Sequence, residues 1–189
     1  MAVAFRTSAQ AAKTLMVLGL LQRGPLHGYE LHRIVVAHGA LYADFKKPTL
    51  YHLLDRLAEA GAVAVTKERG TRGRRGERLI YALTPAGRKL FAELLRDTLG
   101  TYEPLHTGLD VAIVFMARLP ENEARDLMQQ RKSSVLARRS VLAAEPGATG
   151  RLAIDHALRL IDAELAWIED AVTRVGQPPP MAKHNSPAS

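Results

Sequence analysis

The spacing of apolar residues changes at Gly61, and this change constrains the fold more than any other feature of the chain. Before it, residues 48–61 (PTLYHLLDRLAEAG) place leucines 3, 4 and 7 positions after Leu50, which is the single buried stripe of an α-helix. After it, residues 62–68 (AVAVTKE) and 78–84 (RLIYALT) have larger apolar residues at every second position, 63 and 65 in the first and 79, 81 and 83 in the second, which is the period of a β-strand. A helix is therefore followed directly by a predicted hairpin.

Further helical patterns flank this pair. A helix capped by Thr7 or Ser8 is expected to end near 24–25 (Gly-Pro), and a second to run from about 28 to 39. In the third, Pro48 suits the first helical position and Gly61 the left-handed stop. A fourth begins at 84–85 (Thr-Pro), after the hairpin. Three helices, a hairpin and a helix make a winged helix-turn-helix.

The charge of the chain is concentrated in its first half. Residues 1–100 hold 16 Lys and Arg against 8 Asp and Glu, whereas residues 101–189 hold 10 against 11. This asymmetry indicates a module that binds a polyanion, joined to one with another role. A solvated basic face without a partner is the alternative.

The cations lie at the start of the third helix and in the hairpin loop, and a winged helix brings both places to one DNA duplex. A helix start attracts phosphate through its free N–H groups and its dipole, so we expect Lys46, Lys47 and Tyr51 to hold the backbone. Thr, His and Arg can reach base edges in a major groove, and we assign this role to Thr49, His52 and Arg56. The glycine-rich hairpin loop carries cations suited to phosphates or a minor groove: Arg69, Arg72, Arg74 and Arg75.

The second half is predicted to be helical, with segments from about 106, from Pro120, and from about 149 to 175. The last has apolar residues at alternating steps of 4 and 3, the spacing of a coiled-coil seam. A winged helix needs a partner to span two half-sites, so we assign this seam to a homodimer interface. A seam inside one chain's own bundle is the alternative. The predicted interface residues are Ile154, Leu158, Ile161, Leu165, Ile168 and Val172, and the spacing continues to Val175.

This half also contains a candidate effector pocket. Trp167 lies off the seam, seven residues after Leu160, and with Phe115 and Met116 it could line an apolar pocket, although plain packing of Trp167 is the simpler reading. The pairs 106/110 and 155/156 each combine His with Asp, but two such pairs are a weak metal signal. We therefore predict neither a metal nor a cofactor.

Other classes of protein are disfavoured by what the sequence lacks. It contains no phosphate loop, dinucleotide fingerprint, zinc-protease pair or nucleophile elbow, so an enzyme is not expected. With no cysteine, disulfides and thiolate chemistry are excluded. No apolar run reaches the roughly 18 residues of a membrane span, and no secretory signal is recognisable. We expect a cytoplasmic protein that does not enter the membrane.

Three motifs in order resemble the PadR family of bacterial transcriptional regulators: HGYEL at 27–31, PTLYHLLDRLAEAGAV at 48–63 and RLIYALTPAGRK at 78–89. The resemblance implies a homodimeric winged-helix repressor, with a C-terminal helical part that dimerises and often influences the response to small molecules. The chain departs from the family pattern with Pro48-Thr49, with His52 where proline commonly follows the tyrosine, and with Ala58 in place of an acidic residue.

Together these features predict a mostly α (α+β) protein. Residues 1–100 form a winged helix-turn-helix DNA-binding domain with a two-stranded wing, 101–176 a helical dimerisation and possible effector domain, and 177–189 a disordered tail rich in Pro and Ser. The predicted function is sequence-specific binding of double-stranded DNA by a homodimeric repressor whose binding a small molecule modulates. The alternative is a winged-helix module that contacts protein or RNA.

Overall fold

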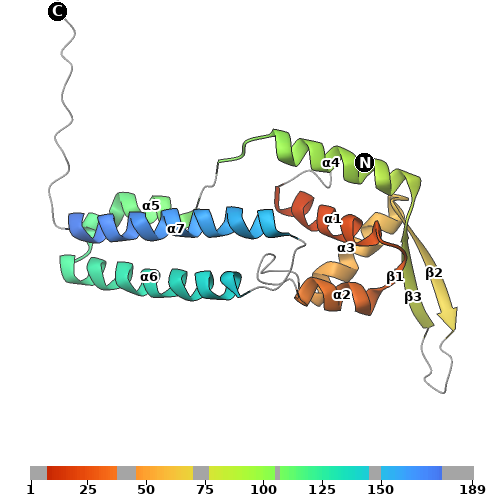
Figure 1. The fold of residues 1–189 in the computed structure, drawn as a ribbon, viewed down its shortest axis with the longest axis horizontal. Helices are drawn as coiled ribbons and strands as arrows, with labels where there is room; N and C mark the ends of the chain where they lie inside the picture. Colours follow the sequence, from red (N-terminus) through yellow and green to blue (C-terminus); the bar gives the residue numbers. More distant parts are fainter. Residues whose placement is uncertain (1–7, 38–45, 70–76, 105–106, 145–149, 176–189) are drawn as a thin grey trace, which may run out of the picture. The chain divides into compact units, whose positions relative to one another are not determined.

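The computed structural model describes residues 8–37, 46–69, 77–104, 107–144 and 150–175. The chain divides into two compact units, Met1–Pro104 and Leu105–Ser189. In the first unit the elements follow the predicted order, with one short strand added (Figure 1). They are α1 (Ser8–Leu21), β1 (Leu26–His27), α2 (Gly28–Ala37), α3 (Lys47–Glu59), β2 (Val63–Arg69), β3 (Glu77–Leu83) and α4 (Pro85–Gly100). The predicted winged helix-turn-helix is confirmed.

The sheet of this unit is antiparallel in the order β1-β3-β2. Val63 pairs with Leu83 at one end of the hairpin and Arg69 with Glu77 at the other. β1 adds two residues to the free edge of β3, with Leu26 opposite Tyr81. The wing is the two-stranded hairpin of β2 and β3, as predicted, and β1 completes a three-stranded sheet.

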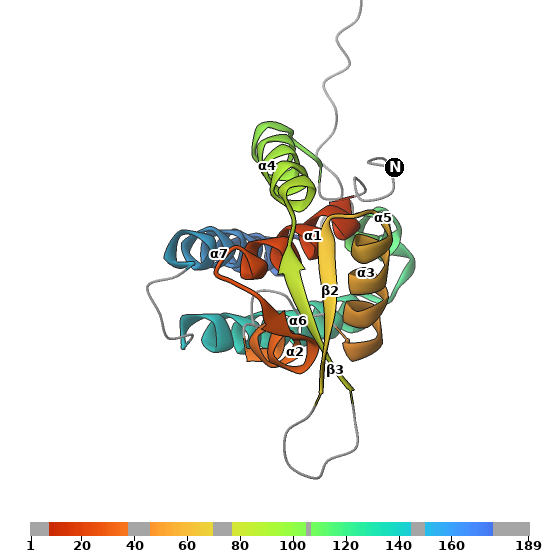
Figure 2. The same cartoon turned by 90° about the vertical axis from the view of Figure 1, so that its right-hand side faces the viewer.

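The core of the first unit lies between α1, α3 and the inner face of the sheet. All four leucines of the α3 stripe are buried, together with Val17, Leu18 and Tyr81. Gly61 has φ +69°, the left-handed conformation predicted for the residue that ends α3. In Figure 1 the helices α1, α2 and α3 lie on one side of the strands β2 and β3, and in Figure 2 the N-terminal end of α3 is on the same side of the unit as α2.

The start of α4 is hydrogen-bonded to the segment that follows α3. Thr84 caps α4, because its Oγ1 accepts the N–H of Gly87 at 3.0 Å and donates to the carbonyls of Gly61 and Ala62. Gly87 lies so close to this turn that a Cβ added to it would be 2.0 Å from the Ala62 carbonyl oxygen. The glycine therefore allows α4 to begin directly against the segment that follows α3.

Every element that the structure describes in the second unit is a helix. The unit contains α5 (Gly108–Phe115), the 3₁₀ turn η2 (Met116–Arg118), α6 (Glu121–Ala143) and α7 (Arg151–Arg174). α6 and α7 pack as an antiparallel pair, and three ion pairs cross between them. These are Arg131–Glu164 at 2.7 Å, Lys132–Glu169 at 2.8 Å and Arg139–Asp162 at 2.6 Å.

Candidate nucleic-acid interface

The start of α3 is an exposed, positively charged helix end. Lys46 precedes the helix in an extended conformation, and Lys47 and Pro48 begin it. Both lysine side chains are exposed, and the first turn contains no acidic residue. The backbone N–H groups of a first turn have no partner within the helix, so this end favours an anion. The structure thus brings the two predicted backbone-binding lysines together.

The predicted base-reading residues lie along the same helix with different exposure. Burial of the leucine stripe turns His52 to solvent, whereas Thr49 and Arg56 are half-buried. Asp55 is also exposed on this helix. The three residues predicted to read bases therefore stand on one element, with His52 the most accessible.

Tyr51, predicted as a surface contact to the DNA backbone, also packs against the core of the unit. Its ring lies against Gly28, where an added Cβ would be 2.9 Å from Tyr51 Cε1 and 3.2 Å from the ring of Tyr81. Tyr51 is half-buried against the core and Tyr81 is fully buried. Burial raises the pKa of the Tyr81 phenol, and Asp55 and Tyr51 add to that rise. Tyr51 thus joins the start of α2 to α3.

The wing carries cations on its strands as well as those predicted in its loop. Arg69 closes β2, and the predicted contacts Arg72, Arg74 and Arg75 lie outside the described residues. Lys67 and Arg78 are exposed on β2 and β3 and were not among the predicted contacts. Both residues lie in the two predicted strands that flank the arginine-rich loop, and this position could have identified them as further wing cations.

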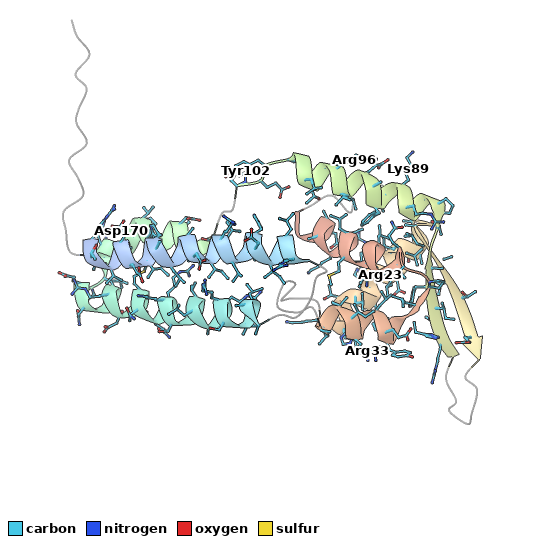
Figure 3. All side chains as sticks on the ribbon, in the orientation of Figure 1. Arg23, Arg33, Lys89, Arg96, Tyr102 and Asp170 are labelled. Carbon is cyan, nitrogen blue, oxygen red and sulfur yellow. The ribbon has the colours of Figure 1, made fainter. Side chains whose placement is uncertain are left out.

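α2 presents a second group that the sequence prediction did not include. Leu31 and Val35 are buried, so Tyr29, Arg33 and Val36 face solvent. The helical spacing of 29, 33 and 36 could have revealed this face, because it is the reverse of the buried pattern. Figure 3 shows Arg33 on α2 and, on the opposite side of the unit, Lys89 and Arg96 on α4.

The predicted dimer seam of α7 is partly covered within the single chain. Ile168 and Val175 are buried, and the other five seam residues are half-buried. By contrast, α5 has no buried residue, and its Val111, Val114 and Phe115 are 61%, 74% and 60% exposed. The prediction of a seam on α7 therefore did not include this exposed apolar surface on α5.

The predicted effector-pocket residues differ in exposure. Phe115 and Leu160 are exposed, while Met116 and Trp167 are half-buried. Of the weak metal pairs, His106 lies outside the described residues, and Asp110 accepts the backbone N–H of Thr107 at 2.7 Å at the start of α5. No group of three His, Asp or Glu side chains in the described part of the chain is placed to hold a metal ion. Nor is any helix of those residues long and apolar enough to cross a membrane.

Comparison with known proteins agrees with this geometry. Residues 17–93 match the model of the Transcriptional regulator PadR-like family. No curated protein matches the chain.

Solved structures share the fold over most of the chain. PadR of Bacillus subtilis in complex with operator DNA is 22% identical with a TM-score of 0.67, covering 86% of this chain and 98% of its own. The same protein in complex with p-coumaric acid is 21% identical, with a TM-score of 0.64 and coverages of 87% and 98%. A PadR-like regulator from Bacillus cereus is 15% identical, with a TM-score of 0.63 and coverages of 86% and 94%. The predicted resemblance is confirmed: residues 17–93 of this chain are similar to the PadR-like family of transcriptional regulators.

Proposed function

We propose that this protein binds a specific DNA operator as a homodimer and represses transcription, and that a small molecule modulates this binding. The observation that carries the proposal is the exposed, acid-free start of α3, with Lys46 and Lys47, in a unit whose charge is strongly positive. Such a helix end binds phosphate, and the helix behind it fits a major groove. A repressor bound at a promoter blocks RNA polymerase.

Each predicted contact has a role in this proposal. Lys46, Lys47 and Tyr51 hold phosphates at the helix start, and Thr49, His52 and Arg56 read base edges. The wing residues Arg69, Arg72, Arg74 and Arg75 hold the neighbouring backbone or minor groove. Because Tyr51 is wedged against Gly28, its contact would also fix the angle between α2 and α3.

The homodimer supplies a second DNA-binding head, by which we mean a second copy of the DNA-binding domain with its α3 helix. Residues 1–100 are the proposed DNA-binding domain, 101–176 the dimerisation domain and 177–189 a tail. We assign the interface to the half-buried seam residues of α7 together with the exposed apolar face of α5. Two α3 helices about one helical turn of DNA apart would then enter successive major grooves.

The proposal that a small molecule modulates DNA binding rests on a similar protein and on four residues of the helical unit. The B. subtilis protein was solved both with operator DNA and with p-coumaric acid. In this chain the proposed pocket is lined by Phe115, Met116, Leu160 and Trp167, all in the helical unit. An effector acts only if it binds one arrangement of the two heads better than the other. This mechanism of regulation requires no catalytic residue. We propose that the protein acts in the cytoplasm.

Fluorescence anisotropy with a labelled duplex tests the proposal. The duplex comes from the region upstream of the protein's own gene, excess random DNA is present, and salt runs from about 50 to 200 mM, where phosphate-driven binding falls steeply. We expect binding to this duplex to survive competition and binding to a shuffled duplex to be lost. Equal, salt-sensitive binding to both moves the search to other promoters. An absence of specific binding at all of them favours the protein- or RNA-contact alternative.

A further inference from the structure

The exposed face of α2 carries an aromatic side chain in a fixed position. Tyr29 is 53% exposed, and its ring stacks on that of His27 with centroids 5.5 Å apart and planes 20° apart. We propose that Tyr29, with Arg33 one turn further along, is a third contact to the DNA backbone beside α3 and the wing. This inference rests on the proposed function and extends it to an element that the sequence prediction left out.

His27 is itself held on three sides. It lies in β1, paired with Ile80 of β3, and its Nε2 is 3.5 Å from a carboxylate oxygen of Glu68 on β2. The Glu30 carboxylate accepts the backbone N–H of His27 at 3.1 Å. The Tyr29 ring therefore stacks on a residue that the sheet immobilises, and a contact made by a pre-positioned side chain loses little entropy on binding.

The charge of this face suits a polyanion. Glu30 is the acidic residue of the first turn of α2, and its carboxylate is bonded to the backbone of its own turn. Arg33 lies four residues after Tyr29 on the exposed side. A phenol hydroxyl and a guanidinium are both donors that proteins use on phosphate oxygens. A duplex backbone fits this combination.

The position of α2 agrees with that assignment. Gly28 contacts the Tyr51 ring, so Tyr29 directly follows the point where α2 meets α3. Figure 2 shows α2, the N-terminal end of α3 and the ends of β2 and β3 that lead to residues 70–76 on one side of the unit. In helix-turn-helix proteins the first helix crosses the backbone while the second enters the groove. α2 is that first helix here.

A salt titration of DNA affinity distinguishes the two proposed contacts. Arg33→Ala should lower affinity and reduce the slope of log K against log salt by about 0.9 for each bound chain, because one phosphate charge is no longer neutralised. Tyr29→Phe should lower affinity by roughly tenfold or more for each bound chain, the scale of one lost hydrogen bond to a charged group, with the slope unchanged. Thermal unfolding by circular dichroism should match the parent protein for both variants.

Matched controls come from the opposite side of the same unit. Arg96 on α4 and Tyr102 just after it are exposed, so Arg96→Ala and Tyr102→Phe should leave affinity and slope unchanged (Figure 3). If both α2 variants bind DNA like the parent protein, the inference is overturned while the proposed function stands. A loss of affinity in Tyr29→Ala without any loss in Tyr29→Phe also overturns it, because the hydroxyl then makes no contact. Failure of the parent protein to bind any duplex rejects the proposed function itself.

Discussion

At the scale of single residues, Gly87 is the most closely packed of the glycines that the structure describes in the winged-helix unit. A Cβ there would meet the Ala62 carbonyl oxygen at 2.0 Å and Leu83 Cδ1 at 2.7 Å. We expect Gly87→Ala to lower the free energy of unfolding by about 3 kcal/mol, the upper range for overpacking, because the start of α4 must move. Urea unfolding followed by circular dichroism measures the change.

Gly100 is the matched control for that substitution. It is the last residue of the same helix, and an added Cβ would meet nothing within 4 Å. Gly100→Ala should change the unfolding free energy by less than about 0.5 kcal/mol. Equal effects of the two alanines would mean that helix propensity, and not the contact with Ala62, decides both.

Tyr81 gives a prediction about alkaline pH. Its folded-state pKa is raised, first by burial and then by Asp55 and Tyr51, above the ordinary tyrosine value. The folded state therefore keeps the phenol proton more tightly than the unfolded chain does. This contribution to stability is complete below the unfolded pKa of about 10 and is lost as the pH rises above it.

The corresponding experiment compares unfolding free energies between about pH 9 and 11. Tyr81→Phe should show a shallower loss of stability across this range than the parent protein, because its ring does not titrate. Tyr102→Phe is the control, since Tyr102 is 88% exposed. A loss in Tyr81→Phe as steep as that of the parent protein would show that other groups set the alkaline limit.

At the scale of elements, the sequence predicted α3, the hairpin and α4 well because each has its own local signal. The leucine stripe, Gly61 and the Thr84-Pro85 start are patterns that neighbouring residues complete among themselves. The strand β1 was not predicted, because two residues have no period and pair only through the distant β3. The contact of Gly28 with Tyr51 was equally invisible, since it depends on how α2 and α3 meet.

The wing and α3 should respond differently to loss of their arginines. Replacing Arg72, Arg74 and Arg75 with alanine should weaken binding to every duplex and flatten its salt dependence, by about 0.9 in slope for each phosphate that is no longer neutralised. Anisotropy titrations at several salt concentrations, on operator and shuffled duplexes, measure both effects. Unchanged affinity in this variant would remove the wing from the interface.

Arg56→Ala on α3 provides the contrast. A base contact carries sequence preference, so its removal should weaken operator binding and leave the shuffled duplex little affected. The same titrations decide the result. Equal losses on both duplexes would make Arg56 a backbone contact.

At the scale of the whole molecule, the heptad spacing of α7 correctly indicates a packed helix but does not identify its partner. A seam between helices of one chain and a seam between two chains follow the same period. The three ion pairs between α6 and α7 show that at least part of that packing is within one chain. The sequence therefore could not decide between the two alternatives, because the deciding contacts come from another helix.

The short helix α5 gives the sharpest test of the proposed dimer. Isolated helices below about 12 residues are marginal in water, and α5 has eight residues with three large apolar side chains exposed. If a second chain covers them, Val111→Glu combined with Val114→Glu places charges in an apolar interface. Sedimentation equilibrium should then show a shift from dimer to monomer. Operator affinity should fall because one reading head dissociates from the other.

The control places the same two charges on α6. Ser133 and Ser134 are exposed, and their hydroxyls donate to the carbonyls of Gln129 and Gln130 within that helix. Ser133→Glu with Ser134→Glu should leave the dimer and operator affinity intact. A dimer that persists in the α5 variant, with unfolding of the helical unit unchanged, would assign the interface to the α7 seam alone. A monomeric parent protein that still distinguishes operator from shuffled DNA would exclude the two-headed mechanism, because one α3 helix would then carry the whole specificity.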